Sequence, residues 1–194
     1  AEKHLWVLIK ATRRLLKDHN VHTLIVGDGV DREHMVRLAD ELGISEHITF
    51  TGRVSDEDKI ALERVGVLYT ISSPAELQSI ATLEAMACGK PVVAVNAGAL
   101  SELCHDGKNG FLFELDDDEG MAEGIAKIIG DKKLQKSFGE ESLRIAKTHD
   151  LSYTLTAFIK LYKKVIKAKK AEVAARPAGF VDRIKESELA EYME

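Results

Sequence analysis

Apolar and polar residues alternate along this chain with the periods of helices and strands in turn. Leu5, Leu8, Leu15 and Leu16 recur at helical spacing, which predicts an amphipathic helix that ends near residues 18–20. Short β-rich runs follow, and segments of helical period separate them. The expected strands span residues 22–26, 47–51, 67–71, 91–95 and 110–114, and the expected helices span residues 31–42, 55–64, 77–88, 100–104, 117–130, 132–148 and 151–170.

This alternation predicts the fold class. Strands that alternate with helices form right-handed βαβ crossovers, so we expect an α/β fold with a Rossmann-like parallel sheet, helices on both faces and a helical C-terminal extension. Ligands of such sheets bind beyond the carboxyl ends of the strands. We expect one domain over residues 1–175 and a charged tail or helix over residues 176–194.

Composition narrows the function classes. A chain of 194 residues with 45% hydrophobic and 30% charged residues can bury one core. Its net charge of -5 argues against a nucleic acid as the main partner. The two cysteines, Cys88 and Cys104, lack the spacing of a metal site or a disulfide framework. No apolar run suggests a membrane span or a signal peptide, so we expect a cytoplasmic protein.

The last helix leaves one alternative open. Six lysines gather on it, and such clusters attract anionic lipid. Peripheral contact with the inner face of a membrane therefore competes with a solvated helix face. The lysines are residues 160, 163, 164, 167, 169 and 170.

Two glutamates suggest chemistry. Glu76 and Glu84 have seven residues between them and lie at the start and in the middle of the helix expected over residues 77–88. A rise of about 1.5 Å per residue separates them by about 12 Å along the axis, roughly the span from the sugar to the ribose of a nucleotide diphosphate sugar. The N–H groups at the start of this helix can hold a diphosphate without a metal ion. Two glutamates taken at random are more often a helix-start carboxylate and a solvated residue.

The residues that follow make the pattern specific. Residues 85–93 read AMACGKPVV, and then come a glycine turn at Gly98, Glu102 and the run DGKNG at 106–110. This order and spacing resemble the group 1 glycosyltransferases, retaining enzymes of the two-domain GT-B architecture, in their C-terminal domain. The resemblance covers about residues 1–165.

The resemblance implies a donor-binding domain of a hexosyltransferase. Glu76 would hold hydroxyls of the donor sugar, and Lys3 would neutralise the leaving phosphate. The other implied donor contacts are Glu84 at the ribose, the backbone of Ser79 and Ile80 at the diphosphate, the Val54 backbone at the base, and Gln78, Gly27 and Arg53 beside them. Uridine nucleotides are the commonest donors in the family, although guanosine donors also occur. We expect no cofactor and no metal ion, with the nucleotide sugar as co-substrate.

Several of these residues have simpler interpretations. Lys3 can be a mobile lysine near the terminus, Gly27 a plain turn glycine, and Arg53 a surface arginine. The acidic run at residues 116–118 is better explained as a helix cap than as a metal motif.

Three departures from the family pattern matter. Ser72-Ser73 stands where the family usually has Pro-Ser, and Leu77-Gln78-Ser79 replaces Gly, an aromatic residue and Gly. A Gln-Ser form occurs in a subset that includes lipid and cell-surface glycosyltransferases. The family's strand ending in Gly-Arg and its N-terminal acceptor domain are missing. We therefore expect the chain alone to bind nucleotide weakly and to transfer sugar poorly or not at all.

Two rival functions remain at this point. A non-catalytic nucleotide-binding or interaction module of the same fold would explain the missing domain. A dinucleotide-binding oxidoreductase would need GxGxxG after the first strand, which this sequence lacks.

Overall fold

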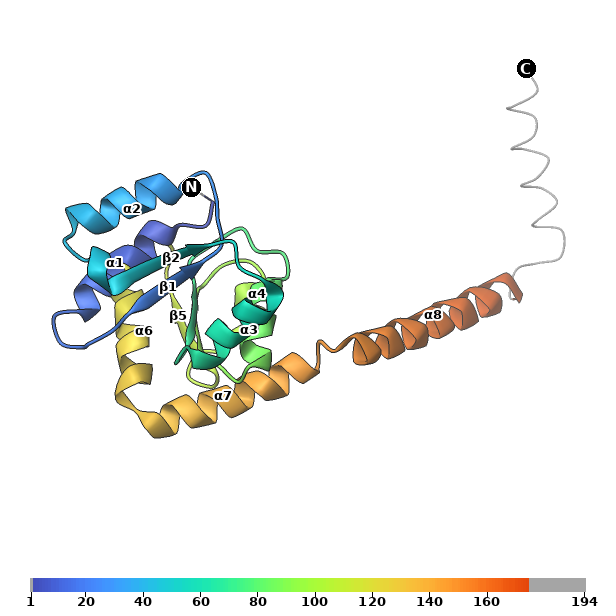
Figure 1. Ribbon diagram of the computed structural model, residues 1–194. Coiled ribbons are helices and arrows are strands. Elements are labelled where there is room, and N and C mark those ends of the chain that lie inside the picture. Colours follow the sequence, from blue (N-terminus) through green and yellow to red (C-terminus); the bar gives the residue numbers. More distant parts are fainter. Residues whose placement is uncertain (1, 175–194) are drawn as a thin grey trace, which may run out of the picture. The chain divides into compact units, whose positions relative to one another are not determined.

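The computed structural model describes residues 2–174 (Figure 1). The tail or helix expected over residues 176–194 lies outside the described residues. The chain divides into two compact units, residues 1–149 and the residues from 150 on. The first unit contains every strand of the described residues and all the candidate donor residues.

The expected α/β fold is confirmed. Two parallel sheets form, β1-β2 and β3-β4-β5. The strands are β1 (Thr23–Val26), β2 (Ile48–Gly52), β3 (Tyr69–Ile71), β4 (Val92–Val95) and β5 (Gly110–Phe113). The helices of the first unit are α1 (Leu5–Leu15), α2 (Arg32–Glu41), the 3-10 helix η1 (Ser45–His47), α3 (Asp56–Val65), α4 (Ile80–Ala87), α5 (Leu100–Leu103), α6 (Asp118–Gly130) and α7 (Lys132–Lys147).

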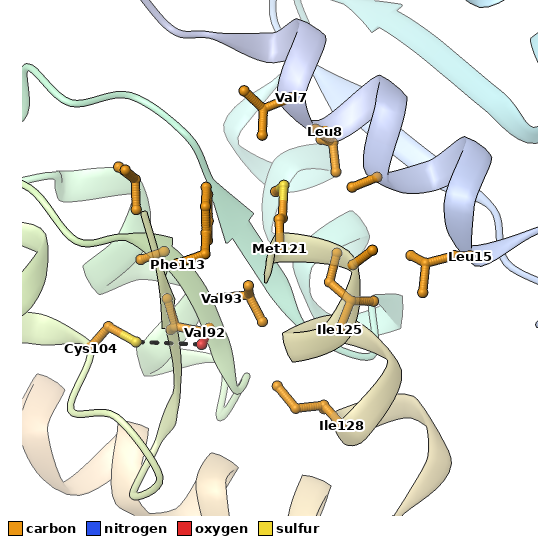
Figure 2. Close-up of a cluster of buried hydrophobic side chains, with 14 of the residues drawn as sticks. Val7, Leu8, Leu15, Val92, Val93, Cys104, Phe113, Met121, Ile125 and Ile128 are labelled. Atoms are coloured by element: carbon orange, nitrogen blue, oxygen red, sulfur yellow. Dashed lines mark hydrogen bonds between the residues drawn. The ribbon is translucent and has the colours of Figure 1, made fainter. Parts of the chain in front are cut away.

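The core is built around β4, the central strand of the larger sheet. All four of its residues are fully buried, as the continuous apolar run predicts. Figure 2 shows Val92 and Val93 of β4 beside Phe113 of β5, with Met121 and Ile125 of α6 toward α1. Burial of each such side chain contributes about 1.5–3 kcal/mol, so this layer holds α1 and α6 against the sheet.

Local capping explains several element ends. Ser55 accepts a hydrogen bond from the Asp58 backbone N–H at 3.1 Å and caps α3, as expected. Asp117 caps α6 by accepting from the Gly120 N–H at 2.8 Å. The acidic run at 116–118 therefore contains a helix cap, which agrees with the interpretation from the sequence.

One predicted boundary is wrong and matters for function. We expected a helix over 77–88, but α4 begins only at Ile80. Ser79 has a left-handed backbone with φ of 50°, which cannot continue into helix, and Leu77 is 98% exposed in a bend. Glu76 and Glu84 therefore do not lie on one helix, and the axial spacing of about 12 Å does not apply to them.

The backbone that follows the C-terminal end of α4 packs closely against the backbone of α7. A Cβ added at Gly139 of α7 would lie 2.3 Å from the carbonyl oxygen of Gly89, the residue that turns the chain after α4 with φ of 70°. Only glycine at position 139 allows this approach. The contact fixes where α4 ends.

The second unit contains α8 (Leu151–Ala174). Its apolar side chains are half or more exposed and recur at helical spacing, with the lysines largely on the other face. The apolar positions are Leu151, Tyr153, Leu155, Phe158, Ile159, Leu161, Tyr162, Val165 and Ile166. Among residues 2–174, no helix is long and apolar enough to cross a bilayer.

Replacement of Gly110 by alanine should unfold the larger sheet. The new Cβ would lie 1.7 Å from the carbonyl oxygen of Val92 in the paired strand. We expect Gly110→Ala to lower the free energy of unfolding by about 3 kcal/mol or more in a urea titration. Gly130→Ala is the matched control, because nothing lies within 4 Å of its new Cβ. Equal effects of the two substitutions would contradict the described packing.

Candidate active site

The loops after β3 and β4 meet at the carboxyl ends of these strands. The backbone N–H of Ala99 donates to the carbonyl oxygen of Glu76 at 3.2 Å. At Gly98, with φ of 52°, a Cβ would lie 2.9 Å from the same carbonyl oxygen. The glycine turn is thus needed for backbone approach to the loop that carries Glu76. This is the edge at which ligands of parallel sheets bind.

Glu76 is held by a lysine from the start of the chain. Lys3 Nζ donates to Glu76 Oε1 at 2.7 Å, although 73 residues separate the two in sequence. The Lys3 side chain is 61% exposed and that of Glu76 only 12%. The pair places an ammonium group and a carboxylate together at the strand ends.

Buried hydroxyls also act on Glu76. Partial burial of the carboxyl group by itself raises its pKa, but hydrogen bonding by Lys3, Ser73 and Ser79 and the Lys3 charge outweigh burial. The pKa of Glu76 is therefore lower than its ordinary value, and the group is ionised near neutral pH. Ser73 Oγ is fully buried and no partner within residues 2–174 meets hydrogen-bond geometry with it, although its hydroxyl is among the groups that lower the pKa of Glu76.

The start of α4 lies directly after these groups. Ser79 makes no side-chain cap, and its Oγ instead lies 2.7 Å from Thr82 Oγ1, with both residues buried. Helix geometry leaves the backbone N–H groups at residues 80–82 outside the helical ladder. The free N–H groups and the positive end of the helix dipole favour an anion here.

Glu84 has a lysine partner of its own. Lys59 Nζ of α3 donates to Glu84 Oε1 at 2.8 Å, and this hydrogen bond raises the pKa of Lys59. One turn further along both helices, Cys88 Sγ lies 3.5 Å from Glu63 Oε2. Burial raises the pKa of Glu63 and of Cys88. Lys59 is not among the residues predicted from the sequence, where its only signal is its place one turn after the Ser55 cap.

The remaining predicted donor residues lie after β1, β2 and β3 and at the start of α4. Gly27, with φ of 117°, donates its N–H to the Gly52 carbonyl oxygen at 3.0 Å and so joins the loops after β1 and β2. Arg53 and Gln78 are exposed, and Val54 is partly exposed. Ile80 is 66% exposed at the first position of α4. Their proposed contacts with a donor stay predictions.

The candidate residues form an open edge. Two shallow hollows of 340 and 200 Å³ lie around residues 16–19 at the end of α1, and none of the candidate donor residues lines them. Within residues 2–174, no three His, Cys, Asp or Glu side chains gather in the manner of a metal site. The polar groups of the candidate residues are the carboxylates of Glu76 and Glu84, the ammonium groups of Lys3 and Lys59, and the backbone N–H groups at residues 80–82.

Comparisons with known proteins identify the family of this chain. The family described as "Glycosyl transferases group 1" matches residues 1–144. D-inositol 3-phosphate glycosyltransferase of Corynebacterium jeikeium is 30% identical over 82% of this chain and 40% of its own length. Lipopolysaccharide core biosynthesis mannosyltransferase LpcC of Rhizobium leguminosarum is 37% identical over 71% of this chain and 40% of its own.

A solved structure is similar as well. Anabaena Alr3699/HepE in complex with UDP and glucose matches with a TM-score of 0.74 and 27% identity, over 84% of this chain and 45% of that one. The two curated relatives named above are longer than this chain, which spans about two fifths of the length of each.

The Lys3–Glu76 pair should stabilise the fold in a pH-dependent way. A carboxyl group with a lowered pKa in the folded state contributes stability above its unfolded pKa and loses it as pH falls through the folded value. We expect Lys3→Ala to reduce the free energy of unfolding near pH 7, and we expect this loss to shrink as the pH falls through the lowered folded-state pKa of Glu76. Urea titrations at a series of pH values below 7 measure the loss. A loss that stays constant down to the acid limit of folding would contradict an ion pair.

Proposed function

Because the chain belongs to the group 1 glycosyltransferase family, we propose that it is the donor-binding domain of a retaining enzyme that transfers a hexose from a nucleotide diphosphate sugar. The observation that most supports this function is the Lys3–Glu76 pair, whose glutamate lies in the chain just before the start of α4. We propose a uridine nucleotide as the donor's carrier, and the neighbour solved with UDP and glucose supports this choice.

The proposed donor position follows from charge. A diphosphate at the start of α4 would meet the N–H groups at residues 80–82 and the ammonium group of Lys3, which has three donor hydrogens and shares only one with Glu76. Glu76, ionised near neutral pH, would accept hydrogen bonds from hydroxyls of the donor sugar. Glu84 would accept from the ribose with the oxygen that Lys59 leaves free.

In the proposed mechanism, Lys3 and the N–H groups of α4 stabilise the charge that develops on the leaving phosphate. When the bond between the anomeric carbon and the diphosphate breaks, negative charge grows on the leaving phosphate. Lys3 and the N–H groups of α4 are in place before this happens, so they stabilise the transition state without reorganisation. Glu76 would orient the sugar, and the acceptor would be supplied through an N-terminal acceptor domain of the GT-B architecture.

A second candidate is a binding module of the same fold without transfer chemistry. The ionised Glu76 and its lysine favour the enzyme. Release of UDP and free glucose from UDP-glucose, with water as the acceptor, separates the two functions, because only the enzyme would raise the rate of this cleavage above the uncatalysed rate.

Calorimetric titration of UDP, GDP and UDP-glucose into the 194-residue chain tests the donor site. We expect one diphosphate to bind saturably and Glu84→Ala to weaken it about tenfold or more, because a charged acceptor for ribose is lost. Glu123→Ala, which removes an exposed glutamate of α6, is the matched control and should leave affinity unchanged. No binding at about millimolar ligand to a folded chain would contradict the proposed site.

A further inference from the structure

Ser72 is a buried serine directly after β3. It is only 4% exposed, and its Oγ lies 3.0 Å from the carbonyl oxygens of both Lys3 and His4. A hydroxyl has one proton to donate, so the two carbonyls share it. This contact ties the end of β3 to the backbone of Lys3 and His4, which lie 69 and 68 residues earlier in the sequence.

The segment that Ser72 holds has a second tie. His4, immediately before α1, has a left-handed backbone with φ of 46°, which is uncommon outside glycine and persists only when its surroundings fix it. Its Nδ1 lies 2.6 Å from Asp116 Oδ1. Ser72 therefore holds the main chain of this segment, and Asp116 holds the His4 side chain.

Lys3 depends on these ties for its position. Its exposed side chain has one hydrogen-bond partner within residues 2–174, Glu76. A long exposed lysine loses much rotamer freedom when it forms an ion pair, so a fixed backbone lowers the cost of that pair.

We propose that Ser72 is a positioning residue that holds the backbone of residues 3 and 4 so that the Lys3 ammonium group stays on Glu76. Its own hydroxyl is buried and committed to the two carbonyls, so it acts through Lys3 and does not touch the donor. The importance of Ser72 for sugar transfer rests on the proposed function. The hydrogen bonds by which Ser72 holds the Lys3 and His4 backbone do not depend on that function.

The first test needs no ligand. The pKa of Glu76 is followed by carboxyl ¹³C NMR in the wild-type chain, Ser72→Ala, Lys3→Ala and the double variant. We expect Ser72→Ala to raise the pKa of Glu76 toward its value in Lys3→Ala, because the lysine that lowers it is no longer held. In the Lys3→Ala background, Ser72→Ala should add no further shift. Ser137→Ala, which removes an exposed hydroxyl of α7, should change nothing.

An unchanged pKa of Glu76 in Ser72→Ala, with a raised one in Lys3→Ala, would overturn the proposal. An unchanged value in both variants would overturn it as well, because the ion pair would then not form in solution. If Ser72→Ala does not fold, Asp116→Gly is the second variant, because it removes the contact of Asp116 with the His4 side chain and so loosens residues 3 and 4. Asp116 has φ of 63°, which glycine adopts readily, and the same rise in pKa is expected.

UDP affinity separates this proposal from the proposed function. We expect Ser72→Ala and Lys3→Ala to weaken UDP binding by a similar factor, about fivefold, and the double variant to be no weaker than Lys3→Ala. Additive losses would overturn the proposal. If the pKa of Glu76 moves as expected but the folded chain does not bind UDP, the positioning role holds and the donor site fails.

Discussion

The fully buried strand β4 is the element on which the rest of the structure depends. It pairs with β3 on one side and β5 on the other, and its side chains lie in the core with those of α6. Because its neighbours are fixed in parallel register, the loops after β3 and β4 leave the sheet at the same edge. The Glu76 loop and the Gly98 turn can then share a hydrogen bond.

At that edge, polar groups are arranged in two pairs. Lys3 with Glu76 and Lys59 with Glu84 each join a carboxylate to an ammonium group from a different element. Because solvent reaches at least one partner of each pair, each contributes modestly to stability, and its further value lies in orientation. Each leaves donor and acceptor capacity unused, which a polar ligand can take up.

Much of this architecture could be predicted from sequence because it depends on local pattern. The apolar run at 92–95, the Ser55 cap and the glycine turns predict elements within a few residues. The start of α4 could not be predicted in this way, since no residue type at positions 77–79 signals the left-handed backbone of Ser79, whose hydroxyl bonds to Thr82 and does not cap the helix. The roles of Lys59 and Ser72 likewise depend on partners 25 or more residues away, which no periodicity reveals.

The glycine contact between α4 and α7 bears on how the protein can change over evolutionary time. Gly139 has no freedom to vary, because any side chain would enter the Gly89 carbonyl. Gln78, in contrast, is exposed at the edge where a ligand would bind. A remote structural position is thus more constrained than one at the candidate site. New specificity can arise by substitution in the loop before α4 while the helix behind it stays anchored.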